Sequence, residues 1–352
     1  MSQSMNPPPG PALRVLDANA NRAREALRVL EDYARFVLNS DELSAILKQH
    51  RHALADVTRP WLADAILFRN TFDDVGKANK TASELQRDGV EDVVIAAGKR
   101  IGEALRAIEE FAKTFSPETA ADVEDLRYRF YDTEQVLAGT LRAANRFASV
   151  RLYVLITESA CRRPWLEVAM EAIKGGADCL QLREKGMEGG ELLARAKQLV
   201  AICRPRGIIS IINDRPDIAI LSGADGVHVG QGDLPATEAR KIVGREPIVG
   251  VSTHSIEQAK QAVLDGADYI GVGPVFASAT KPREILPGLA CAREVAEKIK
   301  IPAVAIAGIN ERNVDEVIAA GIKRIAVTAA VTGCEEVRDA AVRLKQKLLA
   351  AT

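Results

Sequence analysis

The feature that most constrains the fold is a series of eight short β-rich runs separated by helical stretches after residue 148. Strands that alternate with helices in this way pair in parallel. The runs are RLYVLIT at 151–157, CLQLR at 179–183, IISIIN at 208–213, GVHV at 226–229, PIVGVS at 247–252, YIGVG at 269–273, AVAIA at 303–307 and IAVT at 325–328. Eight such repeats in about 200 residues predict an α/β fold, a (β/α)8 TIM barrel, in the C-terminal half.

A doubly wound open sheet would show the same alternation of strands and helices. That fold often carries a G-x-G-x-x-G turn after its first strand, and the sequence lacks this turn after residues 151–157. The apolar run IAILSGA at 218–224 is interpreted as a helix rather than as a further strand. The barrel is therefore the preferred interpretation.

The N-terminal part contains an internal repeat. EALRVLEDYAR at 25–35 returns as EALRAIEEFAK at 103–113, and in both copies the apolar residues fall on one helical stripe. Each copy is followed by a second helix start, Asn39 with Glu42 behind it in one case and Ser116 before Pro117 in the other. Two such helical hairpins predict an all-α helical bundle.

These patterns divide the chain into three segments. We predict a disordered N-terminus at 1–11, a helical domain with the repeated hairpin at 12–147, and a TIM-barrel catalytic domain at 148–352. Between the hairpins, residues 58–92 are mixed in character and rich in polar and turn-forming residues, so they predict a long surface connection.

Composition and charge exclude several classes of partner. Lys plus Arg number 47 against 48 Asp plus Glu, which leaves no basic field for nucleic acid. No apolar run approaches the length of a membrane span, and the start of the chain does not resemble a signal peptide. The five cysteines lack the spacing of a zinc site. We expect a cytoplasmic protein that binds neither nucleic acid nor membrane.

Polar residues follow the predicted strands at the ends where such barrels carry their chemistry. Cationic side chains from two strands suit a pyrophosphate, and two carboxylates from separate strands are suited to share a Mg²⁺ ion. The cations are Arg183, Lys185 and Lys281, and the carboxylates are Asp214 and Asp233. The alternative is that the carboxylates only cap helices and pair with the basic residues.

A second anion site is indicated after the last two strands. In the segments AIAGI at 305–309 and IAVTAA at 325–330, small residues after the strands let backbone N–H groups approach a phosphate, although tight packing also requires small residues. Pyrophosphate and metal on one side and a monophosphate on the other predict a transfer reaction between two phosphorylated small molecules.

Five linked motifs make the chain resemble the thiamine-phosphate synthase family over roughly residues 151–345. They are QLREK at 181–185, INDR at 212–215, DGVHVGQGDLP at 225–235, GVSTHS at 250–255 and GVGPVFASATK at 271–281. The resemblance implies a transferase of thiamine biosynthesis. Its reaction is the Mg²⁺-dependent condensation of 4-amino-2-methyl-5-pyrimidinylmethyl diphosphate with thiazole phosphate, which gives thiamine phosphate and pyrophosphate.

The resemblance also implies roles for individual residues. The expected metal ligands are Asp214 and Asp233, and the expected catalytic residues are Arg183, Lys185, Ser252 and Lys281. The substrate-binding set comprises Gln181, Arg183, Lys185, Asn213, Ser252, Ser278, Thr280, Lys281, Gly308, Val327 and Thr328. Two positions depart from the family pattern: Ala307 replaces a common glycine and Thr328 a common serine. Neither change removes a backbone N–H.

Three alternatives stay open. His228 and His254 are candidate general bases, but the ionisation step needs none, and a histidine beside a packed strand is more often structural. The barrel is also compatible with a thiazole tautomerase or a non-catalytic thiamine-phosphate sensor. The front domain resembles a helical extension fused to this synthase in some bacteria. We interpret it as an assembly or regulatory module, and a homo-oligomer is the form of assembly that we consider.

Overall fold

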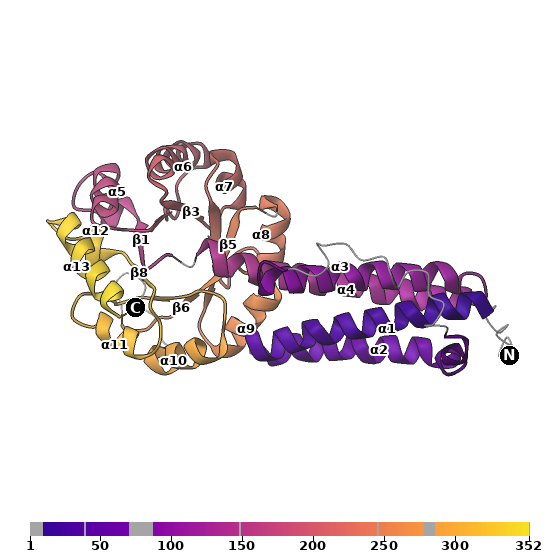
Figure 1. Cartoon of the computed structure of the whole chain (residues 1–352). Helices are drawn as coiled ribbons and strands as arrows, with labels where there is room; N and C mark the ends of the chain where they lie inside the picture. The colour runs from indigo at the N-terminus through magenta and orange to yellow at the C-terminus, as the bar shows by residue number, and fades with distance from the viewer. Residues whose placement is uncertain are drawn as a thin grey trace. The chain divides into compact units, whose positions relative to one another are not determined.

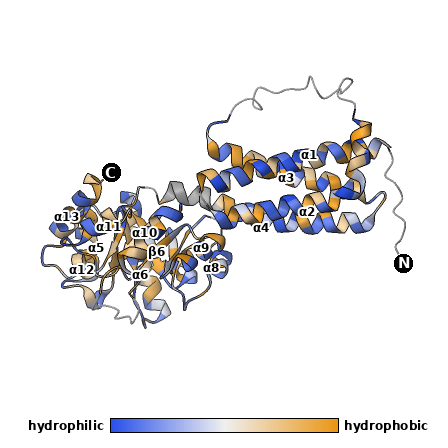
Figure 2. Ribbon diagram, turned by 90° about the horizontal axis from the view of Figure 1, so that it is seen from below, coloured by the Kyte–Doolittle hydropathy of each residue, from blue (hydrophilic) through white to orange (hydrophobic). Residues whose placement is uncertain are grey.

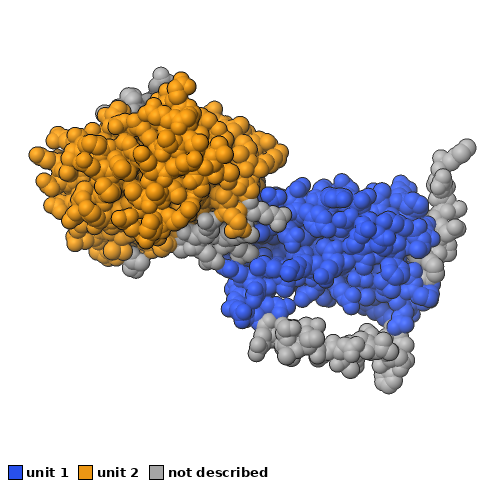
Figure 3. Space-filling view, turned by 90° about the horizontal axis from the view of Figure 1, so that it is seen from above, with its two compact units in different colours: residues 1–138 blue, residues 139–352 orange. Residues whose placement is uncertain are grey.

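The computed structural model describes residues 10–38, 40–69, 87–147, 149–244, 246–277 and 286–351 (Figure 1). The chain divides into two compact units, Met1–Ala138 and Gly139–Thr352 (Figure 3). Residues 1–9 of the N-terminus expected to be disordered lie outside the described residues, whereas residues 10 and 11 begin a helix. The domain limits drawn from the sequence stay a prediction.

The first unit is a bundle built from two helical hairpins. Its long helices are α1 (Gly10–Asp32), α2 (Asp41–Ala65), α3 (Val90–Ala112) and the part of α4 (Pro117–Arg146) up to Ala138. The short π-helix η1 (Tyr33–Val37) follows α1, and the 3-10 turn η2 (Ile66–Phe68) follows α2. The repeated segments lie at corresponding places at the ends of α1 and α3. Each long helix carries both apolar and polar residues along its length (Figure 2), and the apolar stripes pack against one another as the repeat predicts.

Two local details differ from the sequence interpretation. The cap of α2 is Ser40, whose Oγ accepts a hydrogen bond from the backbone N–H of Leu43 at 3.2 Å, while Asn39 lies outside the described residues. The connection predicted from residue 58 also begins later, because α2 continues through Pro60 to Ala65. Trp61 and Ala65 are buried there, and their packing outweighs the backbone hydrogen bond that a proline removes.

The repeat places a buried glutamate at the same position of both copies. Glu31 accepts a hydrogen bond from Arg51 of α2 at 3.0 Å, and Glu109 accepts one from Arg127 of α4 at 3.0 Å. Burial alone raises the pKa of Glu109, but hydrogen bonds from Lys113 and Arg127 outweigh it and hold the pKa below its usual value. Each hairpin is therefore joined by an ion pair between a buried carboxylate and a guanidinium group.

The second unit is a closed barrel of eight parallel strands in sequence order, with β8 paired to β1. The strands are β1 (Leu152–Ile156), β2 (Cys179–Leu182), β3 (Ile209–Asn213), β4 (Gly226–Val229), β5 (Ile248–Thr253), β6 (Tyr269–Val272), β7 (Ala303–Ile306) and β8 (Ile325–Val327). The predicted fold class, a (β/α)8 barrel preceded by an all-α region, is confirmed. Residues 218–222 are helical, as expected, and lie in α7.

Helices cover the outside of this barrel (Figure 1). They are α5 (Trp165–Lys174), α6 (Gly189–Cys203), α7 (Pro216–Ser222), α8 (Ala236–Val243), α9 (Ile256–Leu264), α10 (Gly288–Lys298), α11 (Val314–Ala319), α12 (Ala329–Thr332) and α13 (Val337–Ala350), together with the 3-10 turns η4 (Glu158–Ala160) and η5 (Arg204–Arg206). The main apolar core lies between these helices and the outer face of the strands.

Aromatic side chains fill the barrel interior at the N-terminal ends of the strands. The ring of Phe147, which precedes β1, stacks on Tyr269 with centroids 4.2 Å apart, and Tyr153 meets both rings edge-on. Position 250 on β5 must be glycine for this arrangement, because a Cβ atom there would lie 2.1 Å from the ring of Tyr269. The interior is therefore packed at its N-terminal end, and its open space lies toward the C-terminal ends of the strands.

We predict that Arg127→Ala lowers the free energy of unfolding of the first unit by about 2 kcal/mol, because Glu109 loses its interhelical hydrogen bond while it keeps Arg106 and Lys113 of its own helix. The chain has two tryptophans, so urea unfolding followed by fluorescence in a Trp165→Phe background reports on the buried Trp61 of this unit.

Arg129→Ala is the matched control. Arg129 pairs with Asp125 on the surface of α4, with both side chains more than half exposed, so its loss should cost under about 0.5 kcal/mol. Equal losses from the two variants would contradict a special role for the buried pair.

Candidate functional site

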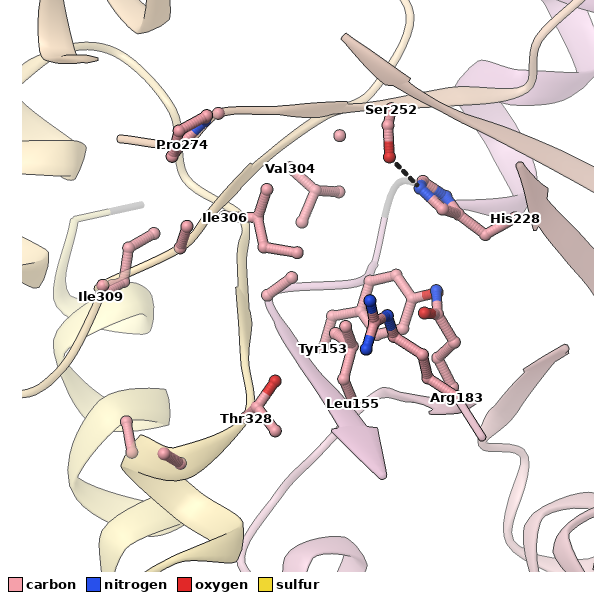
Figure 4. A pocket seen from close by; sticks show the side chains of 18 of the residues that line it. Tyr153, Leu155, Arg183, His228, Ser252, Pro274, Val304, Ile306, Ile309 and Thr328 are labelled. Atoms are coloured by element: carbon pink, nitrogen blue, oxygen red, sulfur yellow. Dashed lines mark hydrogen bonds between the residues drawn. The ribbon is translucent and has the colours of Figure 1, made fainter. Parts of the chain in front are cut away.

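A cavity of about 530 Å³ opens at the C-terminal ends of the barrel strands. One side of the view in Figure 4 holds polar groups, Arg183, His228 and Ser252, and the other holds the apolar side chains of Val304, Ile306 and Ile309. The remaining lining residues are Tyr153, Leu155, Thr157, Gln181, Asn213, His254, Tyr269, Gly271, Gly273, Pro274, Ala277, Ala307, Gly308, Asn310, Ala326, Thr328, Ala329 and Ala330. Size and mixed lining suit a small molecule with both a ring and charged substituents.

Six of the predicted substrate-binding residues line this cavity. Gln181, Arg183, Asn213, Ser252, Gly308 and Thr328 reach it from β2, β3, β5 and the segments after β7 and β8. Ser278, Thr280 and Lys281 lie outside the described residues. Val327 is buried, and its side chain belongs to the core outside the barrel, so a role in binding would fall to its backbone.

The two predicted metal ligands face each other beside the cavity. Asp214 follows β3 in the left-handed backbone region, with φ of 61°, a conformation that aspartate tolerates better than most residues. Burial raises the pKa of Asp214, and the neighbouring carboxylate of Asp233 raises it further. Two carboxylates that repel each other in this way form a favourable place for a divalent cation.

The alternative interpretation of these carboxylates is also visible in the structure. Lys185 Nζ lies 3.4 Å from an oxygen of Asp214, and Asp233 accepts a hydrogen bond from the backbone N–H of Gly230 at 2.9 Å. Lys185 is half exposed, so this pair is weak. Within the described part of the chain, groups of three or more His, Cys, Asp or Glu side chains suited to a metal are absent, which leaves the pair of aspartates as the candidate.

His228 is held inside the barrel by a hydrogen bond at each ring nitrogen. Nδ1 lies 2.9 Å from the hydroxyl of Tyr269 and Nε2 lies 2.9 Å from Oγ of Ser252, a contact drawn in Figure 4. Removal of the ring from solvent lowers its pKa to about 4. The imidazole is therefore neutral at physiological pH, and a ring bonded at both nitrogens fits a structural role better than that of a general base.

His254, the second histidine considered as a base, also lines the cavity. Its Nδ1 bonds to the backbone carbonyl oxygen of Gly273. Because a carbonyl oxygen only accepts, Nδ1 carries the hydrogen.

Sequence reasoning missed several residues that shape the cavity. Tyr153 and Tyr269 lie at its floor, Asn310 lies in the segment after β7, and Leu155, Val304 and Ile306 form its apolar wall. The alternation of inward and outward residues along β1 and β7 is a signal that could have found the apolar wall. Tyr269 is the first residue of β6 and so lies at the N-terminal end of the strand, whereas the predicted site residues were taken from the C-terminal ends.

Comparisons with known proteins agree with this geometry. Residues 152–331 match the family model described as thiamine monophosphate synthase, and residues 14–136 match the ThiD2 family. A thiamine-phosphate synthase from Rhodopirellula baltica is 42% identical over 96% of this chain and 92% of its own length. The chain belongs to the thiamine-phosphate synthase family.

Two further relatives support membership of the family. A thiamine-phosphate synthase from Gloeobacter violaceus is 41% identical and covers 92% of this chain and 93% of its own length. A solved thiamine phosphate pyrophosphorylase from Pyrococcus furiosus is 36% identical with a TM-score of 0.54, and it covers 57% of this chain and 96% of its own. The predicted transferase function is confirmed at the level of this family.

The comparisons also bear on the remaining expectations. Because the bacterial relatives align with more than nine-tenths of the chain, they share the helical unit as well as the barrel. No helix in the described residues is long and apolar enough to cross a bilayer. Self-association of the chain stays a prediction.

Ala307, which stands where the family commonly has glycine, is strained. It has φ of 77°, in the left-handed region that favours glycine. We predict that Ala307→Gly raises the free energy of unfolding of the barrel by about 0.5–1 kcal/mol, since relief of strain exceeds the entropy that glycine loses on folding. Urea unfolding followed by Trp165 fluorescence in a Trp61→Phe background measures it.

Ala305→Gly serves as the control for this substitution. Ala305 lies on β7 without a positive φ and is fully buried, so glycine there should destabilise the barrel. Loss of stability in both variants would show that the backbone of Ala307 is not under strain.

Proposed function

We propose that the cavity condenses 4-amino-2-methyl-5-pyrimidinylmethyl diphosphate with thiazole phosphate, and that Asp214 and Asp233 hold the Mg²⁺ ion the diphosphate requires. The observation that carries this proposal is the facing pair of carboxylates, with Lys185 against Asp214 and with Arg183 in the wall of the neighbouring cavity. Carboxylates, cations and a partly apolar cavity from separate strands together match a diphosphate ester that bears an aromatic ring.

The carboxylate pair fits a magnesium ion by its chemistry. Mg²⁺ prefers oxygen ligands and is commonly held by one or two carboxylates together with substrate phosphates. A cation between Asp214 and Asp233 would remove the repulsion that raises the pKa of Asp214. When bound, Mg²⁺ would neutralise charge on the diphosphate and so make it a better leaving group.

The basic side chains would act on the same leaving group. As the bond between the pyrimidine methylene carbon and the diphosphate oxygen breaks, negative charge builds on that oxygen. Arg183 and Lys185 would stabilise this charge, and Lys281, outside the described residues, is expected to add a third cation. The electron pair of the broken bond leaves with the pyrophosphate, and the aminopyrimidine ring stabilises the methylene cation.

The second step would join the two rings. The thiazole nitrogen donates its lone pair to the methylene carbon, a C–N bond forms, and the positive charge passes to the thiazolium ring. No proton is transferred in this sequence, which agrees with a neutral His228 bonded at both nitrogens. We propose that Gln181, Asn213 and Ser252 position the pyrimidine substrate.

The thiazole phosphate would bind at the opposite side of the cavity. Gly308 and Thr328 line the cavity after β7 and β8, and the side chains around them are small, which leaves room for backbone N–H groups to meet a phosphate. The apolar wall of Val304 and Ile306 would lie against a ring. Ser278 and Thr280, outside the described residues, stay predicted contacts of the same substrate.

We predict that Asp214→Ala lowers turnover about a hundredfold or more, because a charged contact to the departing pyrophosphate is lost with the metal. The measurement is release of pyrophosphate together with formation of thiamine phosphate, with both substrates and Mg²⁺ supplied. Removal of Mg²⁺ by a chelator should abolish release by the unaltered chain, and its return should restore it.

Asp217→Ala is the matched control. Asp217 lies three residues further along at the start of α7 and pairs with Arg215 on the surface, so its loss should leave turnover within about twofold. Near-normal turnover of Asp214→Ala would overturn the assigned metal site. Substrate binding by the unaltered chain without pyrophosphate release would favour the tautomerase or the sensor.

A further inference from the structure

A chain of hydrogen bonds crosses the floor of the cavity and ends at Ser252. Nε2 of Gln181 lies 2.6 Å from the hydroxyl of Tyr153, which lies 3.0 Å from the hydroxyl of Tyr269. Tyr269 in turn lies 2.9 Å from Nδ1 of His228, and Nε2 of His228 lies 2.9 Å from Oγ of Ser252. Five side chains from β1, β2, β4, β5 and β6 are thus linked in one series.

The start of the series limits the direction in which its hydrogens point. The amide nitrogen of Gln181 can only donate, so the oxygen of Tyr153 accepts at that contact. Both tyrosines are at least 98% buried, and a buried hydroxyl hydrogen without an acceptor is costly. If Tyr153 donates to Tyr269 and Tyr269 donates to Nδ1 of His228, every hydroxyl hydrogen of the two tyrosines is satisfied.

The opposite direction leaves a poorly satisfied group. If Nδ1 of His228 donated to Tyr269, then Tyr269 would donate to Tyr153, whose oxygen would accept twice. The hydrogen of Tyr153 would then point to its other polar neighbour, the sulfur of Cys179, and a cysteine sulfur is a weak acceptor. The first direction is therefore preferred, and it places the hydrogen of the neutral imidazole on Nε2.

We infer that Tyr269 and His228 are positioning residues, which hold the hydroxyl of Ser252 as an acceptor toward the histidine and so direct its hydrogen into the cavity as a donor to the substrate. The inference rests on the proposed role of Ser252 in positioning the pyrimidine diphosphate. An acceptor atom of that substrate, a ring nitrogen or a diphosphate oxygen, would then meet a donor whose direction is set before binding. Pre-set donors of this kind need no reorientation during the reaction.

The geometry of Tyr269 allows the hydroxyl to be tested apart from the ring. In Tyr269→Phe the ring can keep its stacking on Phe147 while the bond to His228 is lost. We predict that this variant lowers kcat about tenfold with KM for both substrates within about twofold, and that in a Ser252→Ala background the same change lowers kcat by less than about twofold. Steady-state formation of thiamine phosphate gives kcat for the four full-length proteins: the unaltered chain, Tyr269→Phe, Ser252→Ala and the double variant.

If Tyr269→Phe lowered kcat by the same factor with Ser252 and with Ser252→Ala, the inference would be overturned, because Tyr269 would then act by packing rather than through Ser252.

The tautomer of His228 provides a measurement that does not depend on activity. The chain has four histidines, and the ¹⁵N resonances of labelled protein, assigned by comparison with His228→Asn, distinguish the two neutral forms. In the unaltered chain we expect the hydrogen of His228 on Nε2. In Tyr269→Phe we expect it to move at least partly to Nδ1.

A hydrogen on Nδ1 in the unaltered chain would overturn the inference whatever the kinetic result. If the unaltered chain formed no thiamine phosphate while its His228 carried the hydrogen on Nε2, the proposed function and the role of Ser252 in it would fail together. The direction of the hydrogen bonds alone would stand. The two failures are thus distinguishable in the same set of samples.

Discussion

Closure of the sheet by hydrogen bonds between β8 and β1 is the constraint on which the site depends. All eight strands are parallel and in sequence order, so their C-terminal ends meet at one rim. Gln181, Ser252 and Thr328 are far apart in the sequence, yet they line one cavity because each ends a strand or lies near its end. The rim also collects charge of both signs, since Asp214 and Lys185 follow neighbouring strands.

Repulsion between the carboxylates of Asp214 and Asp233 is the main electrostatic feature of that rim. Burial and a like-charged neighbour both disfavour an ionised Asp214, and a structural role alone does not require such an arrangement. A group held in an unfavourable charge state commonly marks a place where a ligand restores the balance. On the floor of the same cavity, polar atoms are instead satisfied by one another, from Gln181 to Ser252. The two regions suit different tasks, the binding of charged groups at the rim and the orientation of a substrate below it.

Much of the barrel could be predicted from the sequence because strand identity is a local property. The runs of β-branched and apolar residues fixed all eight strands to within about a residue or two at each end. Longer-range features were not accessible in the same way. Tyr153 and Tyr269 are 116 residues apart, and no local pattern indicates that their hydroxyl groups meet across a closed sheet. Helix α2 ran past its expected end because burial of Trp61 overrode the local signal of Pro60.

For the site, too, features carried by residue type could be predicted, and features that depend on the folded backbone could not. The carboxylates and cations after β2, β3 and β4 were recognisable from residue type and position, and Asp214 and Asp233 do lie together. The strain at Ala307 had one indication, the glycine common in the family at this position, but alanine itself does not indicate a backbone angle of 77°. The motifs after β6 include residues that the structure does not describe, so the contacts expected of Lys281 still rest on sequence.

The stack of Phe147 under Tyr269 has a bearing on how molecules enter and leave the cavity. Aromatic rings pack the interior at the N-terminal end, so a molecule in the cavity exchanges with solvent through the rim. Both substrates then enter, and both products leave, through this one opening. A cavity closed at the N-terminal end of its barrel in this manner makes entry and release compete for one path.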